Sequence, residues 1–177
     1  MKEFEFSSLS GGTLHGYRWE PEGKPVAIVQ IIHGIAEHML RYDEFARYLN
    51  ECGVLVVAED HMGHGKSEGT RLYFTGGWET AAEDCYTLLQ MMHAEFPELP
   101  YFLFGHSMGS LAARVYAGRF DRELAGLVVC GSPGWNPGAP FGRLLARVFG
   151  VRSGGRARSR FLKVLTFGPF YRAFKKE

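Results

Sequence analysis

The sequence lacks an apolar stretch long enough to cross a membrane, and it contains few cysteines. No window approaches the roughly 18 consecutive apolar residues of a transmembrane helix. Residues 1–6 alternate charge with phenylalanine and lack the apolar core of a secretory signal peptide. The three cysteines, Cys52, Cys85 and Cys130, have no C-x-x-C spacing. We therefore expect a reduced, cytoplasmic protein in which all three thiols are small core residues.

The chain also has little net charge, but its charges are unevenly distributed. The formal net charge is +1, yet the first 140 residues contain ten basic and eighteen acidic side chains. Residues 141–177 contain ten basic side chains and one acidic one. A length of 177 residues fits one domain or part of one. We expect residues 1–134 to belong to the core and residues 135–177 to a separate basic segment. Nucleic-acid binding is not expected, because glycines interrupt the basic run and the rest of the chain is acidic.

Apolar runs alternate with helical patterns along the first 133 residues. The runs that predict strands cover residues 3–8, 13–20, 26–32, 54–58, 101–104 and 124–130. The patterns that predict helices cover residues 42–53, 80–96 and 111–120. This alternation predicts an α/β fold, with a mostly parallel sheet, helices on both faces and two antiparallel strands at the start. In such sheets ligands bind at the carboxyl ends of strands, where His33, Asp60, Ser107 and Ser132 all fall.

The segment with the clearest chemical meaning reads Gly105-x-Ser107-x-Gly109, between a predicted strand and a predicted helix. This is the context of a nucleophile elbow, in which a serine occupies a sharp, strained turn. The two glycines keep side chains out of the crowded turn. At the amino end of the helix, free N–H groups and the helix dipole favour a developing negative charge at the serine. The alternative is a chance match in a chain with 23 glycines, which the flanking strand and helix make the weaker interpretation.

Three motifs together resemble the α/β-hydrolase fold, and within it the monoacylglycerol lipase and lysophospholipase branch, often grouped with serine aminopeptidases. They read HGIAEH at residues 33–38, DHMGHGKS at residues 60–67 and GHSMG at residues 105–109. The resemblance implies that Ser107 is the nucleophile and that the backbone N–H groups of Ile35 and Met108 form the oxyanion hole. It further implies that no cofactor or metal is needed. The residues that it assigns to shaping the site are His33, Gly34, Gly105, His106 and Gly109.

Two positions depart from the pattern of this branch. Ser110 stands where many relatives carry glycine, and another small residue should still let the helix pack closely against its strand. Ile35 is bulkier than the small residue common at its position, so we expect it to narrow the mouth of the acyl pocket.

The histidines invite a metal-site hypothesis, which we consider weaker. His33, Glu37 and His38 form H-x-x-x-E-H, one residue away from the H-x-x-E-H pattern of a zinc peptidase. His61 and His64 lie in a glycine-rich loop, where their spacing dictates no shared face. We therefore expect no metal site, and we expect these histidines to shape the loops around the site.

The sequence does not contain a complete catalytic triad. A serine hydrolase of this fold takes its triad in the order serine, acid, histidine. No histidine follows His106, and the acids after Ser107 are Asp121, Glu123 and Glu177. His106 is a poor candidate for the base, because neighbours around a sharp turn point apart, and we expect it to pack underneath. We expect the chain to be the amino-terminal part of a longer hydrolase, with the first six strands and the start of a cap. Alone it should be nearly inactive, and its last strand should have an unpaired apolar edge.

The basic segment has two interpretations. Five apolar residues recur at helical spacing: Phe141, Leu144, Leu145, Val148 and Phe149. One interpretation is a cap, inserted after the sixth strand as in the resembled family, that guides an acyl chain and contacts anionic membrane surfaces through its arginines. The other is an ordinary helix with a solvated basic face. We favour the cap.

The resulting expectation is a serine esterase that acts on monoacylglycerol-like or lysophospholipid-like esters through an acyl-enzyme. Two alternatives remain open. One is another carboxylesterase or a thioesterase, and the other is a ligand-binding protein that uses the hydrolase fold without catalysis.

Overall fold

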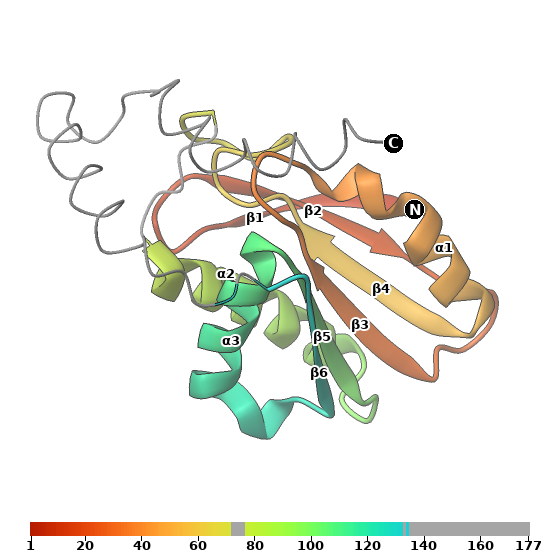
Figure 1. Cartoon of the computed structure of the whole chain (residues 1–177). Coiled ribbons are helices and arrows are strands. Elements are labelled where there is room, and N and C mark those ends of the chain that lie inside the picture. The colour runs from red at the N-terminus through yellow and green to blue at the C-terminus, as the bar shows by residue number, and fades with distance from the viewer. Residues whose placement is uncertain (72–76, 133, 135–177) are drawn as a thin grey trace, which may run out of the picture. The chain divides into compact units, whose positions relative to one another are not determined.

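The structure, a computed structural model, describes residues 1–71, 77–132 and 134 (Figure 1). Residues Met1–Pro133 form one unit of the chain. The expected cap, residues 135–177, lies outside the described residues. The elements, in chain order, are β1 (Lys2–Ser7), β2 (Thr13–Trp19), β3 (Ala27–Ile32), η1 (Met39–Tyr42), α1 (Asp43–Glu51), β4 (Val54–Glu59), α2 (Gly77–Glu95), β5 (Tyr101–His106), α3 (Met108–Phe120), η2 (Asp121–Glu123) and β6 (Gly126–Cys130).

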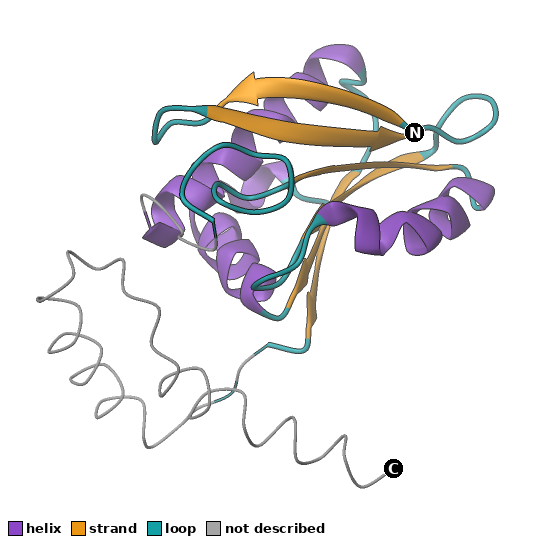
Figure 2. Cartoon of the chain, turned by 90° about the horizontal axis from the view of Figure 1, so that it is seen from above, coloured by secondary structure: helices purple, strands orange, loops and turns teal. Residues whose placement is uncertain are grey.

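The strands form one six-stranded sheet in the order β1-β2-β4-β3-β5-β6 (Figures 1 and 2). β1 pairs with β2 and β2 with β4 in antiparallel fashion, whereas the remaining pairs are parallel. The mostly parallel sheet with antiparallel strands at its start, predicted from the alternation of apolar runs, is confirmed. Several boundaries differ by two or three residues. α2 and α3 each begin three residues before the predicted start, at Gly77 and Met108, and β5 extends two residues further, to His106. β6 begins at Gly126 rather than at residue 124, because the 3-10 turn η2 precedes it and Leu124 caps that turn.

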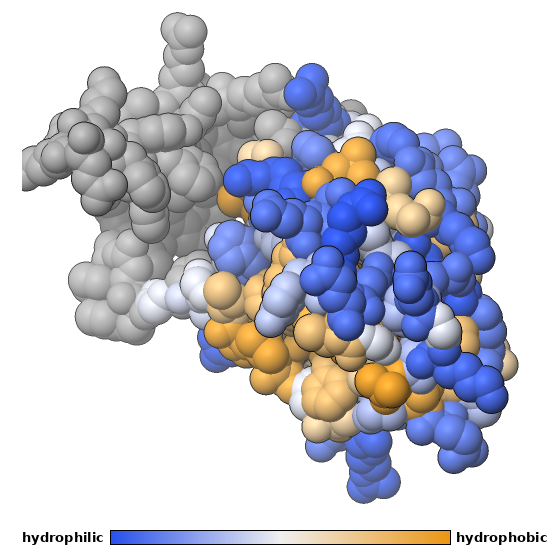
Figure 3. Space-filling view, turned by 90° about the vertical axis from the view of Figure 1, so that its right-hand side faces the viewer, coloured by the Kyte–Doolittle hydropathy of each residue, from blue (hydrophilic) through white to orange (hydrophobic). Residues whose placement is uncertain are grey.

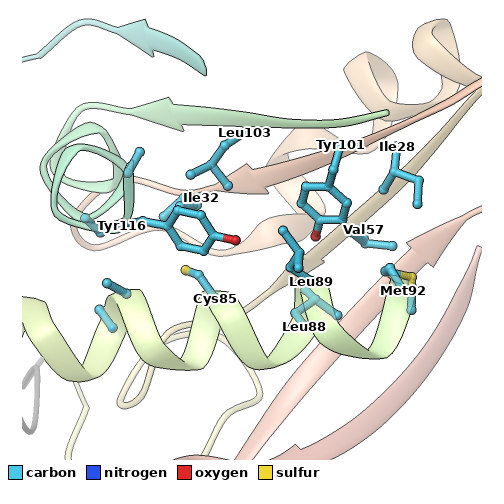
Figure 4. Close-up of a cluster of buried hydrophobic side chains, with 14 of the residues drawn as sticks. Ile28, Ile32, Val57, Cys85, Leu88, Leu89, Met92, Tyr101, Leu103 and Tyr116 are labelled. Carbon is cyan, nitrogen blue, oxygen red and sulfur yellow. The ribbon is translucent and has the colours of Figure 1, made fainter. Parts of the chain in front are cut away.

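Helices cover both faces of the sheet, as predicted. α1 packs on one face, where Ala46 joins a buried cluster with Trp19, Ile31 and Val56. α2 and α3 cover the other face, in the larger cluster drawn in Figure 4. In that view Cys85 and Leu89 of α2 point towards Tyr116 of α3 and Tyr101 of β5. Each helix thus buries one apolar face against the sheet, which is the main source of stability in a layered fold.

The order of the strands brings two loops together at one edge of the sheet. The chain runs from β3 through α1 to β4, and then crosses back through α2 to β5, on the other side of β3. β3 and β5 are direct parallel neighbours, with Ile32 opposite Gly105. The residues that follow these two strands therefore emerge side by side. A reversal of this kind is where open α/β sheets bind their ligands.

β6 is an edge strand with an apolar surface. Among the described residues it pairs with β5 and with no other strand. Its side chains are exposed on both faces, including Leu127, Val128 and Val129 at 38%, 50% and 41% of their full surface. Figure 3 shows that hydrophobic side chains gather on part of one face within a largely hydrophilic surface. The expectation of an apolar edge on the last strand therefore holds for the part of the chain that is described.

The expectation that all three cysteines lie in the core is wrong for two of them. Cys85 is buried, but Cys52 and Cys130 are exposed, and all three are free thiols. Cys130 is exposed because it lies on the edge strand β6, and Cys52 because it follows the last turn of α1. In the described ranges, none of the helices has the length and apolar character needed to cross a bilayer.

Candidate active site

Ser107 lies in a strained turn between β5 and α3. Its backbone angles are φ 51° and ψ −115°, a region that costs a residue with a side chain about 1–3 kcal/mol. Its N–H donates to the carbonyl of Cys130 over 2.9 Å, and its own carbonyl accepts from the Ser110 hydroxyl over 2.5 Å. Ser107 precedes the first residue of α3, so the turn presents its side chain where the amides of the helix start have no acceptor within the helix.

The glycines on either side of Ser107 have no room for a side chain. A Cβ on Gly109 would lie 2.2 Å from the carbonyl oxygen of Ile32. A Cβ on Gly105 would lie 2.7 Å from Cβ of Ala113. The turn therefore packs directly against the end of β3 and against its own helix, which is why its shape demands glycine at both positions.

The loop after β3 lies against Ser107. A Cβ built on Gly34 would be 3.2 Å from Cβ of Ser107. Buried His33 fixes the next peptide: its Nδ1–H donates to the Gly34 carbonyl over 2.7 Å, while its Nε2 accepts from the His61 N–H over 3.0 Å. Burial lowers the pKa of His33 to about 4, so the imidazole is neutral at physiological pH. Both of its ring nitrogens are thereby committed to backbone groups.

Asp60 connects three segments of the chain. Its carboxylate accepts hydrogen bonds from the Tyr17 hydroxyl at 2.9 Å, the Met39 N–H at 2.8 Å and the Lys66 N–H at 2.9 Å. The side chain is fully buried. Two backbone amides and one hydroxyl donate to Asp60. Its carboxylate therefore holds these loop segments together and does not orient a catalytic base.

A second carboxylate, Glu37, organises the loop after β3. Its Oε1 accepts from the Gly34 N–H at 2.5 Å and from the Tyr42 hydroxyl at 2.8 Å. Its Oε2 pairs with Arg41 at 3.0 Å. From the sequence, Glu37 was considered only as a metal ligand, and no role in the site was predicted for Tyr42 or Arg41. The signal was their proximity in the sequence, since all three residues follow Gly34 within eight positions, although Arg41 and Tyr42 lie beyond the motif at residues 33–38.

His106 belongs to the same group of side chains. Its Nδ1 lies 2.9 Å from the Tyr42 oxygen and 3.3 Å from Oε1 of Glu37. The side chain is 40% exposed. His106 therefore does not pack beneath the elbow as expected, but faces the loop that precedes α1. The backbone reverses direction at Ser107, so the side chains of His106 and Ser107 lie on different sides of the turn.

Three histidines lie close together behind the site. The ring centre of His33 is 4.3 Å from that of His61 and 5.3 Å from that of His64. Burial is the largest cause that lowers the pKa of His61 and of His64. Within residues 1–71 and 77–132, no group of three or more His, Cys, Asp or Glu side chains has the arrangement of a metal site. The rings pack against one another as neutral aromatic groups.

The described residues provide a strained serine and backbone amides after the neighbouring strand ends, but no base. The part of the chain that the structure describes gives the Ser107 hydroxyl no hydrogen-bonded histidine or carboxylate. The candidate oxyanion donors, the N–H groups of Ile35 and Met108, follow the ends of the neighbouring strands β3 and β5. Such preorganised donors are the groups that stabilise a developing oxyanion.

The sheet order and the serine at the bend after its fifth strand define an α/β-hydrolase core. The comparison with known families agrees: the chain belongs to the family described as serine aminopeptidase, S33, which matches residues 23–157.

Relatives of this chain are named as lipases. It is 40% identical over 111 residues to monoglyceride lipase of Homo sapiens, a match that covers 63% of this chain and 36% of that protein. It is 35% identical over 129 residues to monoacylglycerol lipase of Mycolicibacterium smegmatis, which covers 73% of this chain and 46% of the relative. The chain therefore spans less than half the length of these relatives.

Solved structures show the same fold. A thermostable carboxyl esterase from Bacillus coagulans, in complex with glycerol, matches with a TM-score of 0.79 and 35% identity, over 92% of this chain and 54% of the esterase. A lipase in an open form matches with a TM-score of 0.82 and 31% identity, over 94% of this chain and 56% of the lipase.

Proposed function

We propose that this chain is the nucleophile-bearing part of a serine hydrolase that cleaves carboxylic esters of lipids, such as monoacylglycerols or lysophospholipids. The observation that carries the proposal is the backbone of Ser107, held at φ 51° between a parallel strand and a helix. The named activities of the relatives support the substrate class. An ester is favoured over a peptide with a free amino terminus, because that amine needs an acidic partner. Glu37 is an acid beside the site, but its oxygens are engaged by Gly34, Tyr42 and Arg41.

In the proposed reaction, the Ser107 oxygen attacks the acyl carbonyl carbon while a histidine takes the hydroxyl proton. The carbonyl oxygen becomes an oxyanion, which the N–H groups of Ile35 and Met108 stabilise. Losing one such donor typically costs about a hundred- to a thousand-fold in rate. The histidine then gives its proton to the departing alcohol, which leaves an ester on Ser107. Water, activated by the same histidine, attacks that ester, and the fatty acid is released.

The base and its acid partner are proposed to come from polypeptide outside these 177 residues. Buried His33 has both ring nitrogens engaged by backbone groups. His106 faces Tyr42, and no later histidine exists in the sequence. In this proposal residues 1–134 are the amino-terminal part of the core. Residues 135–177 begin a cap whose basic and apolar sequence supports contact with an anionic lipid surface. A cytoplasmic location is also proposed, supported by the three free cysteines.

A second candidate is a carboxylesterase for simpler esters, which the likeness to the Bacillus coagulans esterase supports. The two candidates differ in how the rate depends on the substrate. The test is to measure kcat/KM for p-nitrophenyl esters from two to sixteen carbons, and for monoacylglycerol and lysophosphatidylcholine, in a protein that carries this chain and its full triad. A lipid hydrolase should prefer long chains and the lipid substrates. Preference for the shortest esters would support the carboxylesterase, and absence of turnover would support a binding protein.

A further inference from the structure

The two polar groups of Gly34 are each fixed by a different side chain. Its carbonyl accepts the Nδ1–H of His33 at 2.7 Å, and its N–H donates to Oε1 of Glu37 at 2.5 Å. In the described ranges all peptide bonds are trans. The N–H of Ile35 therefore points opposite to the Gly34 carbonyl, and so away from His33. The orientation of the Ile35 N–H, the proposed oxyanion donor, is thus set by the contacts of His33 and Glu37 with Gly34.

This loop is strained and needs to be held. Ala36 has φ 60°, in the left-handed region, which a residue with a side chain adopts at a cost. Ser107, against which this loop lies, also has a positive φ. The Glu37 carboxylate closes the loop by reaching back three residues to the Gly34 N–H. Strained backbone at a site persists only where surrounding contacts over-determine it.

The Glu37 carboxylate is itself tied to the residue before the nucleophile. The single proton of the Tyr42 hydroxyl is donated to Oε1 of Glu37, at 2.8 Å. The contact between Tyr42 and Nδ1 of His106, at 2.9 Å, must then use the histidine proton, which is shared with Oε1 of Glu37 at 3.3 Å. Hydrogen bonds therefore run from His106 through Tyr42 to Glu37 and to the backbone of Gly34. Both loops of the site, after β3 and after β5, are joined by this chain of contacts.

The environment of Glu37 favours its ionised form. Burial alone would raise the pKa of the carboxyl, but the hydrogen bonds from Tyr42, Gly34 and His106 outweigh it and lower the pKa below its usual value. A hydrogen bond from a backbone amide to a carboxylate is stronger than one to a neutral acceptor.

We infer that Glu37 is a positioning residue for the ester hydrolysis proposed above: it fixes the His33–Gly34 peptide through the Gly34 N–H, while His33 fixes the Gly34–Ile35 peptide through its carbonyl, so that the Ile35 N–H is presented to the oxyanion. The inference rests on the proposed function of Ser107. In this inference Glu37 acts through the backbone of Gly34. Its loss should therefore lower kcat rather than weaken substrate binding.

The kinetic test uses a protein that carries this chain and its complete triad, with p-nitrophenyl butyrate as the substrate. Glu37→Ala removes the acceptor and should lower kcat by about a hundred-fold, with KM changed by less than about three-fold. Glu37→Gln keeps an oxygen that can accept from Gly34. Its kcat should therefore be only about ten-fold below that of the wild type. Glu44→Ala, an exposed acid of α1, is the matched control and should leave both constants unchanged. If Glu37→Ala does not fold, Tyr42→Phe replaces it and should lower kcat about ten-fold.

A second measurement does not depend on activity. In NMR spectra the Gly34 amide proton should be shifted far downfield by its bond to the carboxylate. It should move upfield in Glu37→Ala and return part of the way in Glu37→Gln. If the wild-type protein is inactive, the proposed function fails, while the Gly34 resonance still tests whether Glu37 holds the loop. The inference is overturned if folded Glu37→Ala keeps kcat within about two-fold of an active wild type, if Glu37→Gln recovers nothing, or if the Gly34 resonance does not move.

Discussion

The amide of Ser107 donates a hydrogen bond to the carbonyl of Cys130, across 2.9 Å. This bond ties the sharp turn after β5 to the last residue of β6. The turn is therefore supported from both neighbouring strands, since Gly109 also packs against the backbone at the end of β3. The position of the candidate nucleophile thus depends on an edge strand that carries exposed apolar side chains.

The first prediction concerns this edge. A lysine on an exposed edge strand discourages pairing with other chains. Val128→Lys should therefore reduce self-association of the 177-residue chain, as measured by light scattering at equal concentration. Val26→Lys is the matched control, because Val26 is an exposed valine outside the strands and should have no such effect. If the wild-type chain is a monodisperse, cooperatively melting monomer, this expectation is wrong.

The second prediction concerns the close packing of the turn. Gly109→Ala places a Cβ against the Ile32 carbonyl and should lower the free energy of unfolding by about 2–4 kcal/mol. Gly118→Ala lies in the same helix with open space around it and should raise that free energy by about 0.5–1 kcal/mol. Urea denaturation of both variants measures the difference. Equal effects of the two substitutions would contradict the packing argument.

The third prediction concerns Glu59, which is completely buried at the end of β4. Burial raises its pKa to about 8, against a usual value near 4.5. The folded protein therefore retains a proton that the unfolded chain releases, so stability should fall as the pH rises from about 4.5 towards 8. Glu59→Gln removes this titration and should stabilise the protein by on the order of 4 kcal/mol at pH 8.

The benefit of Glu59→Gln should shrink at pH 5, where the wild-type carboxyl is protonated in the folded state. Thermal melts at pH 5 and pH 8 measure it, with Glu44→Gln as the control at an exposed position. A gain that is the same at both pH values would mean that Glu59 does not titrate in this range.

The fourth prediction concerns His33, whose effect on stability has the opposite pH dependence to that of Glu59. Its pKa in the folded protein is lowered to about 4 by burial, against 6.5 when exposed. As the pH falls from about 6.5 to 4, the unfolded chain binds a proton that the folded protein does not accept. Stability should be lost over this window, on the order of 3 kcal/mol in full. His33→Gln should show a shallower loss, and the exposed His38→Gln should follow the wild type.

Local sequence patterns were sufficient to predict the strands, the helices and the strained turn at Ser107. Apolar runs such as residues 54–58 are long enough to identify a buried strand, and Gly105, Ser107 and Gly109 form a recognisable pattern within five positions. Such features depend on neighbours within a few positions, which the sequence displays directly.

The contacts that organise the site depend on distant residues. Tyr42 and His106 are 64 positions apart, and His106 and Glu37 are 69 apart. No local pattern encodes these pairings, because they arise from the crossover that places β5 beside β3. The same reason explains the misplaced thiol of Cys130: the exposure of a strand depends on what lies next to it in the sheet, and not on its own apolar sequence.

The central claim is that Ser107 is an activated nucleophile in the protein that carries this chain. The most direct measurement is labelling of that protein with a fluorophosphonate probe, followed by mass mapping of the adduct. We expect stoichiometric modification of Ser107 in the wild type and no modification in Ser107→Ala. An intact, folded protein that takes up no probe, or a Ser107→Ala variant that is labelled as fast as the wild type, would contradict it.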